Sequence, residues 1–594
     1  MIKLADYIVK RLESRGISDV FLISGGGAMH LNDAFGKSKK IKYYCNHNEQ
    51  ASSMAAEGYA RIKQKLAVVN VTTGPGGLNC LNGVFGQWTD SVPVLYISGQ
   101  VKYETTVASC RNLNLRQLGD QEADIISVVK PLTKYAVMVT DPDTIKYHLD
   151  KAIFTALNGR KGPVWLDIPM NVQAAMIDEK KLKNYNPQDG SPKFADYSKK
   201  IPLIISKLQK AKRPLIVAGH GIRLSSSEVL FKKLLNKINI PAVSTFNGMD
   251  LLDDSSKNFA GRIGTIGQRH GNFTLQNADV ILFLGTRNNI RQISYNWENF
   301  ARNAYKIVVD IDSAELRKPT VAAQMKINAD LGVFLKEFYE KTPQIQKPLW
   351  LKHTQKLKEQ YSFKNTESYR QKGNKINPYY FVRILTEKIK KNSPVIAANG
   401  SASVCLFQAG RVKGQRFCFN SGDASMGYDL PASIGACIAS GKKETICIAG
   451  DGSIMMNLQE LQTIKHHSLP VKIFILNNNG YVSIKQTQNN FFNGRNCGAG
   501  TSSGVSMPDF FKLAKVFGIK SVKLNNPSFI EKTITAVLNE KGPVLCEVIT
   551  APDYIFTPKL SARKLDDGTM ISPSLEDMYP FLDRAEFNKN IIKD

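Results

Sequence analysis

Short apolar runs alternate with longer segments of helical periodicity along most of the chain. Runs such as VFLIS (20–24), VILFLG (280–285) and VKIFIL (471–476) contain almost no polar residue, which is typical of strands buried on both faces of a parallel sheet. Between such runs lie segments like ADYIVKRLESRG (5–16), where apolar residues recur at helical spacing. This alternation predicts an α/β fold of doubly wound parallel sheets.

Polar stretches of low periodicity divide this pattern into three blocks. One linker, DEKKLKNYNPQDGSPKFADY, covers residues 178–197, and a second covers about 341–375. Both are rich in residues that interrupt regular structure. We predict three doubly wound domains followed by a polar tail, at 1–180, 195–342, 375–555 and 556–594.

Composition narrows the class of protein. A chain of 594 residues is too long for one core, and 43% hydrophobic with 22% charged residues is ordinary for a globular protein. No apolar run approaches the roughly 18 residues that span a bilayer, and the N-terminus lacks the apolar core of a signal peptide. We therefore expect a cytoplasmic protein without a membrane partner.

Charge and cysteines exclude further classes. The net charge is +28, but the lysines are scattered rather than clustered with aromatic residues. We therefore predict no nucleic-acid partner, while attraction of anionic substrates stays open. The nine cysteines form no C-x-x-C pair, which indicates reduced thiols and no metal cluster.

Two apolar runs of the third block end in residues that carry chemistry. TICIAG is followed by Asp451, in GDGS, and VKIFIL is followed by the asparagines of NNNG. Ligands of doubly wound sheets sit beyond the carboxyl ends of the strands. Carboxylate and amide oxygens suit Mg²⁺ bound to a diphosphate, whereas GDGS alone is equally typical of an ordinary turn.

GDGS followed by NNNG resembles the signature of thiamine-diphosphate-dependent enzymes. The resemblance implies that Asp451, Asn478 and the carbonyl of Gly480 bind Mg²⁺. The segment SGDASMGYDLPASIGA resembles the part that lies under the cofactor's pyrimidine, so Met426 would hold the cofactor bent, although a core methionine is the alternative. The other third-block residues implied for the cofactor are Ser425, Gly452, Ser453, Tyr481 and Ser483.

The first block would hold the other end of the cofactor. In this family a Glu binds the aminopyrimidine ring, and NHNEQASSMAAEGYAR offers Glu49 as the catalytic residue. It must hold a proton, or share one with the ring nitrogen. Gly26, Gly76 and Gln121 would line the same pocket, while Glu57 is interpreted as structural. The family pairs blocks from two subunits, which implies a homodimer or homotetramer.

Within the family, the chain is most similar to the acetolactate synthase group. SVPVLYISGQV, GPVWLDIP and MNLQELQTIKHHSLPVKIFILNN carry this likeness. It implies decarboxylation of pyruvate and transfer of the hydroxyethyl unit to a second carbonyl. The middle block resembles the group's FAD domain, unless that domain is vestigial here. The implied FAD contacts are Gly219, Gly221, Gly285, Arg287, Asp310, Asp312 and Asp330.

The match weakens at the positions that face the acceptor. Arg291 suits a carboxylate, but Asp120, Met170 and Thr487 replace the group's usual Phe, Lys and Trp. An alternative is therefore a carboligase that adds a two-carbon unit to a nucleotide-linked keto sugar in surface-polysaccharide synthesis. A non-catalytic cofactor-binding homologue is a further alternative. The tail is either a lid over the site or a passive strap, and a regulatory subunit is left open.

Overall fold

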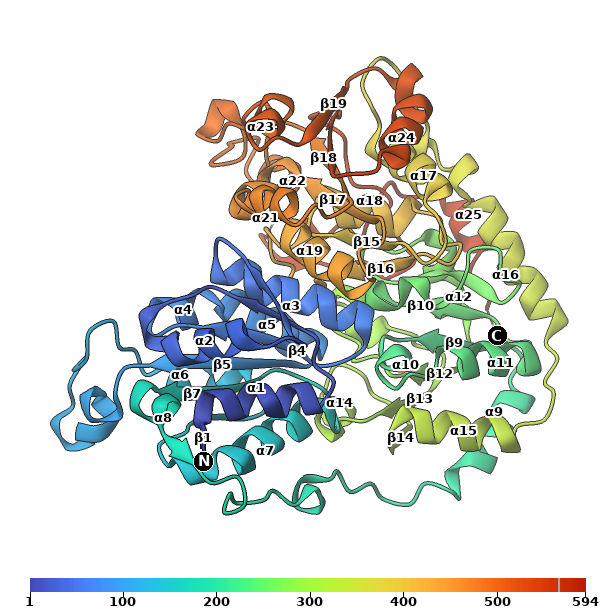
Figure 1. Cartoon of the computed structure of the whole chain (residues 1–594). Helices are drawn as coiled ribbons and strands as arrows, with labels where there is room; N and C mark the ends of the chain where they lie inside the picture. Colours follow the sequence, from blue (N-terminus) through green and yellow to red (C-terminus); the bar gives the residue numbers. More distant parts are fainter. Residues whose placement is uncertain (565–566, 594) are drawn as a thin grey trace.

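The computed structural model describes residues 1–564 and 567–593 and contains three six-stranded sheets. Every strand pairing within these sheets is parallel. Figure 1 shows the first domain in blue, the central domain in green and the third domain in yellow to orange. The predicted fold class of three doubly wound parallel-sheet domains is therefore confirmed.

The first domain has the strand order β3-β2-β4-β5-β7-β6. Its strands are β2 (Asp19–Leu22), β3 (Lys42–Cys45), β4 (Ala67–Val71), β5 (Val94–Gln100), β6 (Ala136–Met138) and β7 (Val164–Pro169). Its helices are α1 (Leu4–Ser14), α2 (Met29–Lys37), α3 (Glu49–Lys63), α4 (Pro75–Asn79), α5 (Leu81–Asp90), α6 (Ile125–Val129), α7 (Ile145–Leu157) and α8 (Met170–Ala174). A short antiparallel pair, β1 (Ile2–Lys3) with β8 (Met176–Ile177), joins its two ends.

The third domain repeats this topology, with the order β16-β15-β17-β18-β20-β19. Its strands are β15 (Pro394–Ala397), β16 (Arg416–Phe419), β17 (Thr445–Gly450), β18 (Val471–Asn477), β19 (Lys520–Leu524) and β20 (Val544–Ile549). Its helices are α17 (Pro378–Lys388), α18 (Ser401–Ala409), α19 (Asp429–Ala439), α20 (Asp451–Ile454), α21 (Glu460–His466), α22 (Val482–Phe491), α23 (Phe510–Val516) and α24 (Ile530–Asn539).

The central domain differs, because its order β11-β10-β9-β12-β13-β14 reverses direction between β9 and β12. This is the strand order of dinucleotide-binding folds, whose ligand lies at that reversal. The strands are β9 (Pro214–Ala218), β10 (Ala242–Ser244), β11 (Phe259–Arg262), β12 (Val280–Leu284), β13 (Tyr305–Asp310) and β14 (Met325–Asn328). The helices are α9 (Lys200–Lys210), α10 (Gly221–Leu224), α11 (Glu228–Ile238), α12 (Arg269–Asn277), α13 (Ile290–Ile293), α14 (Ser313–Arg317) and α15 (Leu331–Lys341).

The first and third domains share one hydrophobic core. Val69 and Trp165 of the first domain belong to the same buried cluster as Ile473 of the third. Helices α3 and α19 cross closely, since a Cβ atom on Gly58 would lie 2.1 Å from the carbonyl oxygen of Ala432. The small residues of α3 therefore make it an interdomain helix.

Linkers and tail run along the outside of this assembly. An extended segment passes from the first domain to α9 along the lower edge of Figure 1, and α16 (Pro348–Gln360) leads toward the third domain. The tail contains β21 (Arg563–Lys564), β22 (Met570–Ile571) and α25 (Arg584–Lys589), and it packs on the central domain through the buried residue Leu575. Across the described residues, no helix combines the length and the apolar character needed to cross a membrane.

Candidate active site

Asp451 ties together the ends of two neighbouring strands. It follows β17 directly and is 2% exposed. Its Oδ2 accepts hydrogen bonds from the backbone N–H groups of Asn478 (3.1 Å) and Gly480 (2.9 Å), and its Oδ1 accepts one from Gly452 (2.8 Å). Burial raises the pKa of the Asp451 carboxyl, and these N–H groups act against the rise. The carboxylate therefore fixes the loop after β18 against the start of α20.

Asn478 carries an oxygen that the chain does not pair. The residue is 3% exposed, and in the described part of the chain its Oδ1 has no hydrogen-bond partner. Leaving such an acceptor unpaired costs about 1–3 kcal/mol, which indicates a ligand at this point. Within residues 1–564 and 567–593, no group of three or more His, Cys, Asp or Glu residues could hold a metal. A metal here would depend on amide, carbonyl and phosphate oxygens, the ligand set that suits Mg²⁺.

The turn around this pair leaves no room for side chains. A Cβ atom on Gly452 would lie 2.0 Å from the Tyr481 ring, and one on Gly480, whose φ is +134°, would lie 2.3 Å from the carbonyl oxygen of Ala499. Glycine at both positions lets the backbone pack this closely against Tyr481 and Ala499.

Ser453 links this turn to the segment that contains Met426. Its Oγ accepts a hydrogen bond from the N–H of Gly427 (2.9 Å) and donates one to Asp429 Oδ2 (2.6 Å). Burial raises the pKa of the Asp429 carboxyl to about 6. Of the other predicted cofactor residues, Ser425 is buried, Met426 is half-buried and Ser483 is exposed.

Glu49 is the first residue of α3 and lies at the carboxyl end of the first sheet. Its Oε2 accepts a hydrogen bond from Asn79 Nδ2 at 2.9 Å. A Cβ atom on Gly76 would lie 3.4 Å from Glu49 Oε1, so this glycine keeps the carboxyl group accessible. Gly26 has open space at its Cβ position. Glu49 is thus half-buried beside a surface of small residues.

A buried carboxylate of the third domain anchors the turn before Glu49. Glu460 Oε2 accepts a hydrogen bond from Asn46 Nδ2, and its Oε1 accepts one from the backbone of His47, both at 2.8 Å. Glu460 is fully buried. Glu460 was not among the residues predicted from the sequence, although a Glu within the apolar segment MNLQELQTI was the available signal.

The central domain contains a cavity of about 310 Å³ at the reversal between β9 and β12. Gly221, Gly285, Arg287, Asp310 and Asp330 line it, all among the predicted FAD residues. The other two do not line it. Gly219 lies behind the wall, where a Cβ atom would be 2.2 Å from the carbonyl oxygen of Gly285, and Asp312 caps α14.

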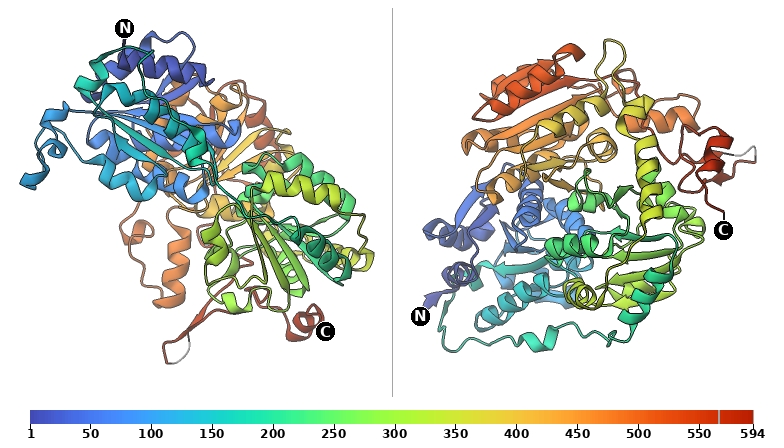
Figure 2. Two further views of the ribbon diagram at one scale, coloured as in Figure 1. Left: turned by 90° about the horizontal axis from the view of Figure 1, so that it is seen from below. Right: turned by 90° about the vertical axis from the view of Figure 1, so that its right-hand side faces the viewer.

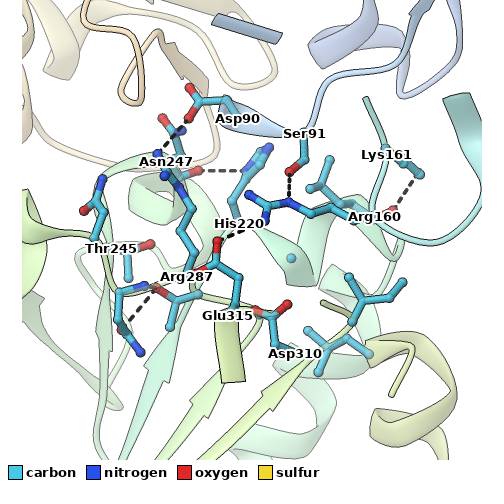
Figure 3. Close-up of a pocket in the computed structure, with 18 of the residues that line it drawn as sticks. Asp90, Ser91, Arg160, Lys161, His220, Thr245, Asn247, Arg287, Asp310 and Glu315 are labelled. Atoms are coloured by element: carbon cyan, nitrogen blue, oxygen red, sulfur yellow. Dashed lines mark hydrogen bonds and ion pairs between the residues drawn. The ribbon is translucent and has the colours of Figure 1, made fainter. Parts of the chain in front are cut away.

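Two basic residues of the first domain also reach this cavity. They were not predicted from the sequence. Arg160 Nη1 forms ion pairs with Asp312 Oδ2 (2.8 Å) and Glu315 Oε1 (2.9 Å), and Lys161 lies beside it (Figure 3). Burial raises the pKa of the Asp310 carboxyl to about 6. The cavity therefore offers both cations and carboxylates to a ligand of mixed polarity.

The four predicted acceptor residues lie on separate elements. Arg291 lines the central cavity with its guanidinium 4.6 Å from the centre of the Phe246 ring, and burial lowers its pKa. Met170 begins α8, Thr487 lies on α22, and Asp120 is exposed. Among the described residues, these four share no hydrogen bond or ion pair with one another.

Asp120 and Gln121 lie at the returning end of a projecting segment, where a Cβ atom on Gly74 would be 1.9 Å from the carbonyl oxygen of Gln121. The chain after β5 extends away from the first domain at the left of Figure 1 and in the left view of Figure 2. Leu113, Leu115 and Leu118 in this segment are 57%, 39% and 45% exposed. Exposed leucines so close together indicate a surface that contacts another molecule.

Fold and site together define a class, the three-domain α/β enzymes that bind thiamine diphosphate. The chain belongs to the thiamine pyrophosphate enzyme family. The family's N-terminal TPP binding domain matches residues 2–127 of this chain. The family's central domain matches residues 201–338, and its C-terminal TPP binding domain matches residues 398–548.

Curated relatives match nearly the whole chain. The acetolactate synthase large subunit of Lactococcus lactis subsp. lactis is 30% identical, with 97% of each chain covered. That of Buchnera aphidicola subsp. Schizaphis graminum is 31% identical, with 95% of this chain and 97% of the relative covered. The acetolactate synthase isozyme 2 large subunit of Escherichia coli K12 is 29% identical, with 92% and 95% covered. The predicted resemblance to this group is confirmed.

Proposed function

We propose that the protein decarboxylates pyruvate and transfers the two-carbon unit to a second carbonyl compound, using thiamine diphosphate and Mg²⁺. The observation that carries this proposal is the unpaired Oδ1 of Asn478 beside Asp451. The Asp451–Asn478 pair supports cofactor binding, because a buried unpaired amide oxygen needs a ligand to satisfy it. Carbon dioxide release from pyruvate distinguishes the enzyme from a non-catalytic cofactor-binding homologue.

Asp451, Asn478 and the Gly480 carbonyl would hold Mg²⁺, and Gly452 would let the backbone approach the diphosphate. When bound, thiamine diphosphate accepts the electron pair that the loss of carbon dioxide releases. Glu49 would hold a proton at the ring nitrogen of the cofactor, and Asn79 orients its carboxyl group by the 2.9 Å hydrogen bond. A homodimer that pairs Glu49 of one copy with Asp451 of the other is part of this proposal.

FAD is proposed for the central cavity. The strand order there is that of dinucleotide-binding folds. The volume of about 310 Å³ falls within the range of cofactor sites. Arg160, Lys161 and Arg287 would face the diphosphate, and Asp310 would face a ribose.

A second candidate concerns the acceptor. A cavity of about 560 Å³ lies between α22 and the tail, lined in part by Lys485, Asn489, Lys559 and Tyr579. Lysines suit a diphosphate, and amide and phenol groups suit sugar hydroxyls. Thr487, on the same helix, is exposed and does not line this cavity, but it is smaller than the Trp of the group. These features favour a nucleotide-linked keto sugar over a second small keto acid.

The test supplies purified protein with pyruvate, thiamine diphosphate and Mg²⁺, and measures carbon dioxide release and products by mass spectrometry. We expect slow acetolactate formation from pyruvate alone and faster pyruvate consumption with a nucleotide-linked keto sugar. Fast acetolactate formation that no keto sugar changes would reject the second candidate only. Absence of carbon dioxide release under all conditions would reject the enzymatic function itself.

A further inference from the structure

A separate cavity of about 280 Å³ lies where the central domain, α16 and the third domain meet. α12 contributes one wall and the α16 segment, with the short turn Phe363–Asn365, another. α17 and the chain after α18 complete it. None of the residues assigned above to a cofactor or substrate lines this cavity.

Basic side chains dominate its lining. Arg269, Lys358, Lys364, Arg383 and Arg411 all line it, against the carboxylates of Asp254 and Glu359 alone. Asp254 is already engaged, because its Oδ1 lies 2.6 Å from Nη2 of the fully buried Arg262. Glu387, outside the lining, pairs with Arg383 at 2.7 Å and lies 3.6 Å from Arg411. The excess of positive charge therefore comes from Arg269, Lys358 and Lys364.

In the described part of the chain, Lys358 and Arg269 form no ion pair with a carboxylate. Lys358 Nζ donates to the backbone carbonyl of Asp254 at 2.7 Å, and Arg269 Nη1 donates to that of Met578 at 3.1 Å. Burial lowers the pKa of both side chains. A carbonyl satisfies a hydrogen bond but does not balance a charge, so an anion entering the cavity would stabilise both cations.

Two residues of the lining also carry buried polar atoms without partners among the described residues. Ser362 and His270 line the cavity, and in the described chain neither Ser362 Oγ nor His270 Nδ1 has a hydrogen-bond partner. His270 is 5% exposed. Together with the cations, these atoms form a site in which donors from three parts of the chain converge.

We propose that this cavity binds a polyanionic small molecule, a phosphorylated metabolite of up to nucleotide size. Its volume is close to that of the central cavity, and several cations rather than one would contact the ligand. The site also contacts the tail, since Arg269 holds the Met578 carbonyl and Gln408 donates to the Pro558 carbonyl. A bound anion would therefore fasten the central domain, the third domain and the tail to one another.

The test uses full-length protein saturated with thiamine diphosphate, Mg²⁺ and FAD, so that the other phosphate-binding sites are filled. ADP and fructose 1,6-bisphosphate are titrated separately by isothermal calorimetry, which distinguishes a nucleotide site from a general phosphate site. Lys364→Gln combined with Arg411→Gln removes two partly exposed cations of the lining. The control, Lys352→Gln combined with Lys356→Gln, removes two exposed charges of α16 that do not line the cavity.

We expect saturable binding of at least one probe to the wild-type protein and to the control. The cavity variant should bind it at least about tenfold more weakly, since each lost charge-assisted hydrogen bond contributes to affinity. Its thermal unfolding without the probe should match that of the control. Binding of neither probe to the wild-type protein, or equal weakening in both variants, would overturn the proposal.

Discussion

Asp451 Oδ2 lies 2.9 Å from the backbone nitrogen of Gly480, so a carboxylate after one strand organises the loop after its neighbour. The backbone alone thus satisfies part of this carboxylate, whereas the side-chain oxygen of Asn478 has no partner in the described chain. The two residues should therefore differ in what they contribute. Asp451 stabilises the loop as well as serving as a proposed metal ligand, whereas Asn478 Oδ1 has only the ligand to serve.

Asn478→Ala should not lower the melting temperature of the ligand-free protein, because the replaced oxygen pairs with nothing in the described chain. Its affinity for thiamine diphosphate with Mg²⁺ should fall by more than about 100-fold, since even outer-shell partners of a metal are worth about 10- to 100-fold. Titration followed by intrinsic fluorescence measures the affinity.

The neighbouring residue supplies the control for that variant. Asn477 Nδ2 donates to Glu547 Oε1 at 2.7 Å, and Glu547 is buried. Asn477→Ala should lower the free energy of unfolding by about 1–3 kcal/mol and leave cofactor affinity unchanged. If Asn478→Ala instead loses stability and keeps the cofactor, Asn478 is not a ligand.

Glu49→Gln should keep the cofactor bound and reduce turnover by about 10²- to 10⁴-fold, because an amide cannot exchange a proton with the ring nitrogen. Exchange of the thiazolium C2 proton, followed by NMR, measures the step directly. Glu179→Gln is the control, since Glu179 is an exposed partner of Lys10 in the same domain. Wild-type exchange in Glu49→Gln would remove Glu49 from the proposed role.

Purified protein should be yellow, with the visible absorbance of oxidised flavin. Gly221→Ala should lose that absorbance, because the new Cβ atom would lie 2.7 Å from Gly285 Cα in the cavity wall. Gly36→Ala is the control, since its Cβ position meets nothing within 4 Å. Colourless wild-type protein that takes up no added FAD would mean that the central domain binds no flavin.

Asp167, on β7, should make stability depend on pH. It is fully buried, Ser98 Oγ donates to it at 2.5 Å, and burial raises its pKa from 3.8 to about 7. The folded protein binds the Asp167 proton more tightly than the unfolded chain does. The protonated side chain therefore contributes stability at low pH, and this contribution is lost as the pH rises from about 4 to 7. The loss amounts to at most about 4 kcal/mol.

Asp167→Asn reproduces the neutral side chain and should remove this dependence. Urea unfolding at pH 5 and pH 8 should show the variant gaining stability relative to the wild-type protein at the higher pH. If the free energies of unfolding of the two proteins differ by the same amount at pH 5 and at pH 8, the assignment is wrong.

Thr487→Trp should slow consumption of a nucleotide-linked keto sugar and leave acetolactate formation from pyruvate largely unchanged, because a larger side chain fills the space beside α22. Thr487→Ser is the control, since a hydroxyl at this position can keep the 3.1 Å hydrogen bond to the Ser483 carbonyl. Mass spectrometry of the two products measures both rates. Equal loss of both products would mean that Thr487 does not sort acceptors.

Part of the site could be predicted because its residues follow strands directly. Asp451 comes straight after β17, and Asn478 straight after β18. Once both segments are identified as neighbouring parallel strands, their ends must meet at one edge. Arg160 and Lys161 could not be found in this way, because they reach the central cavity from another domain. The acceptor roles of Asp120, Met170 and Thr487, and the domain limits, stay predictions.

The sequence by itself determined the three parallel sheets. A strand buried on both faces, such as β12, must be apolar at nearly every position, and such strands are typical of parallel sheets. It also determined the family, through the carboxylate and amide at two strand ends. Only the tertiary structure decided the strand orders, the docking of α3 on α19, and the basic cavity beneath the tail. These depend on which surfaces pack together over long sequence separations, and no local pattern of apolar and polar residues encodes that choice.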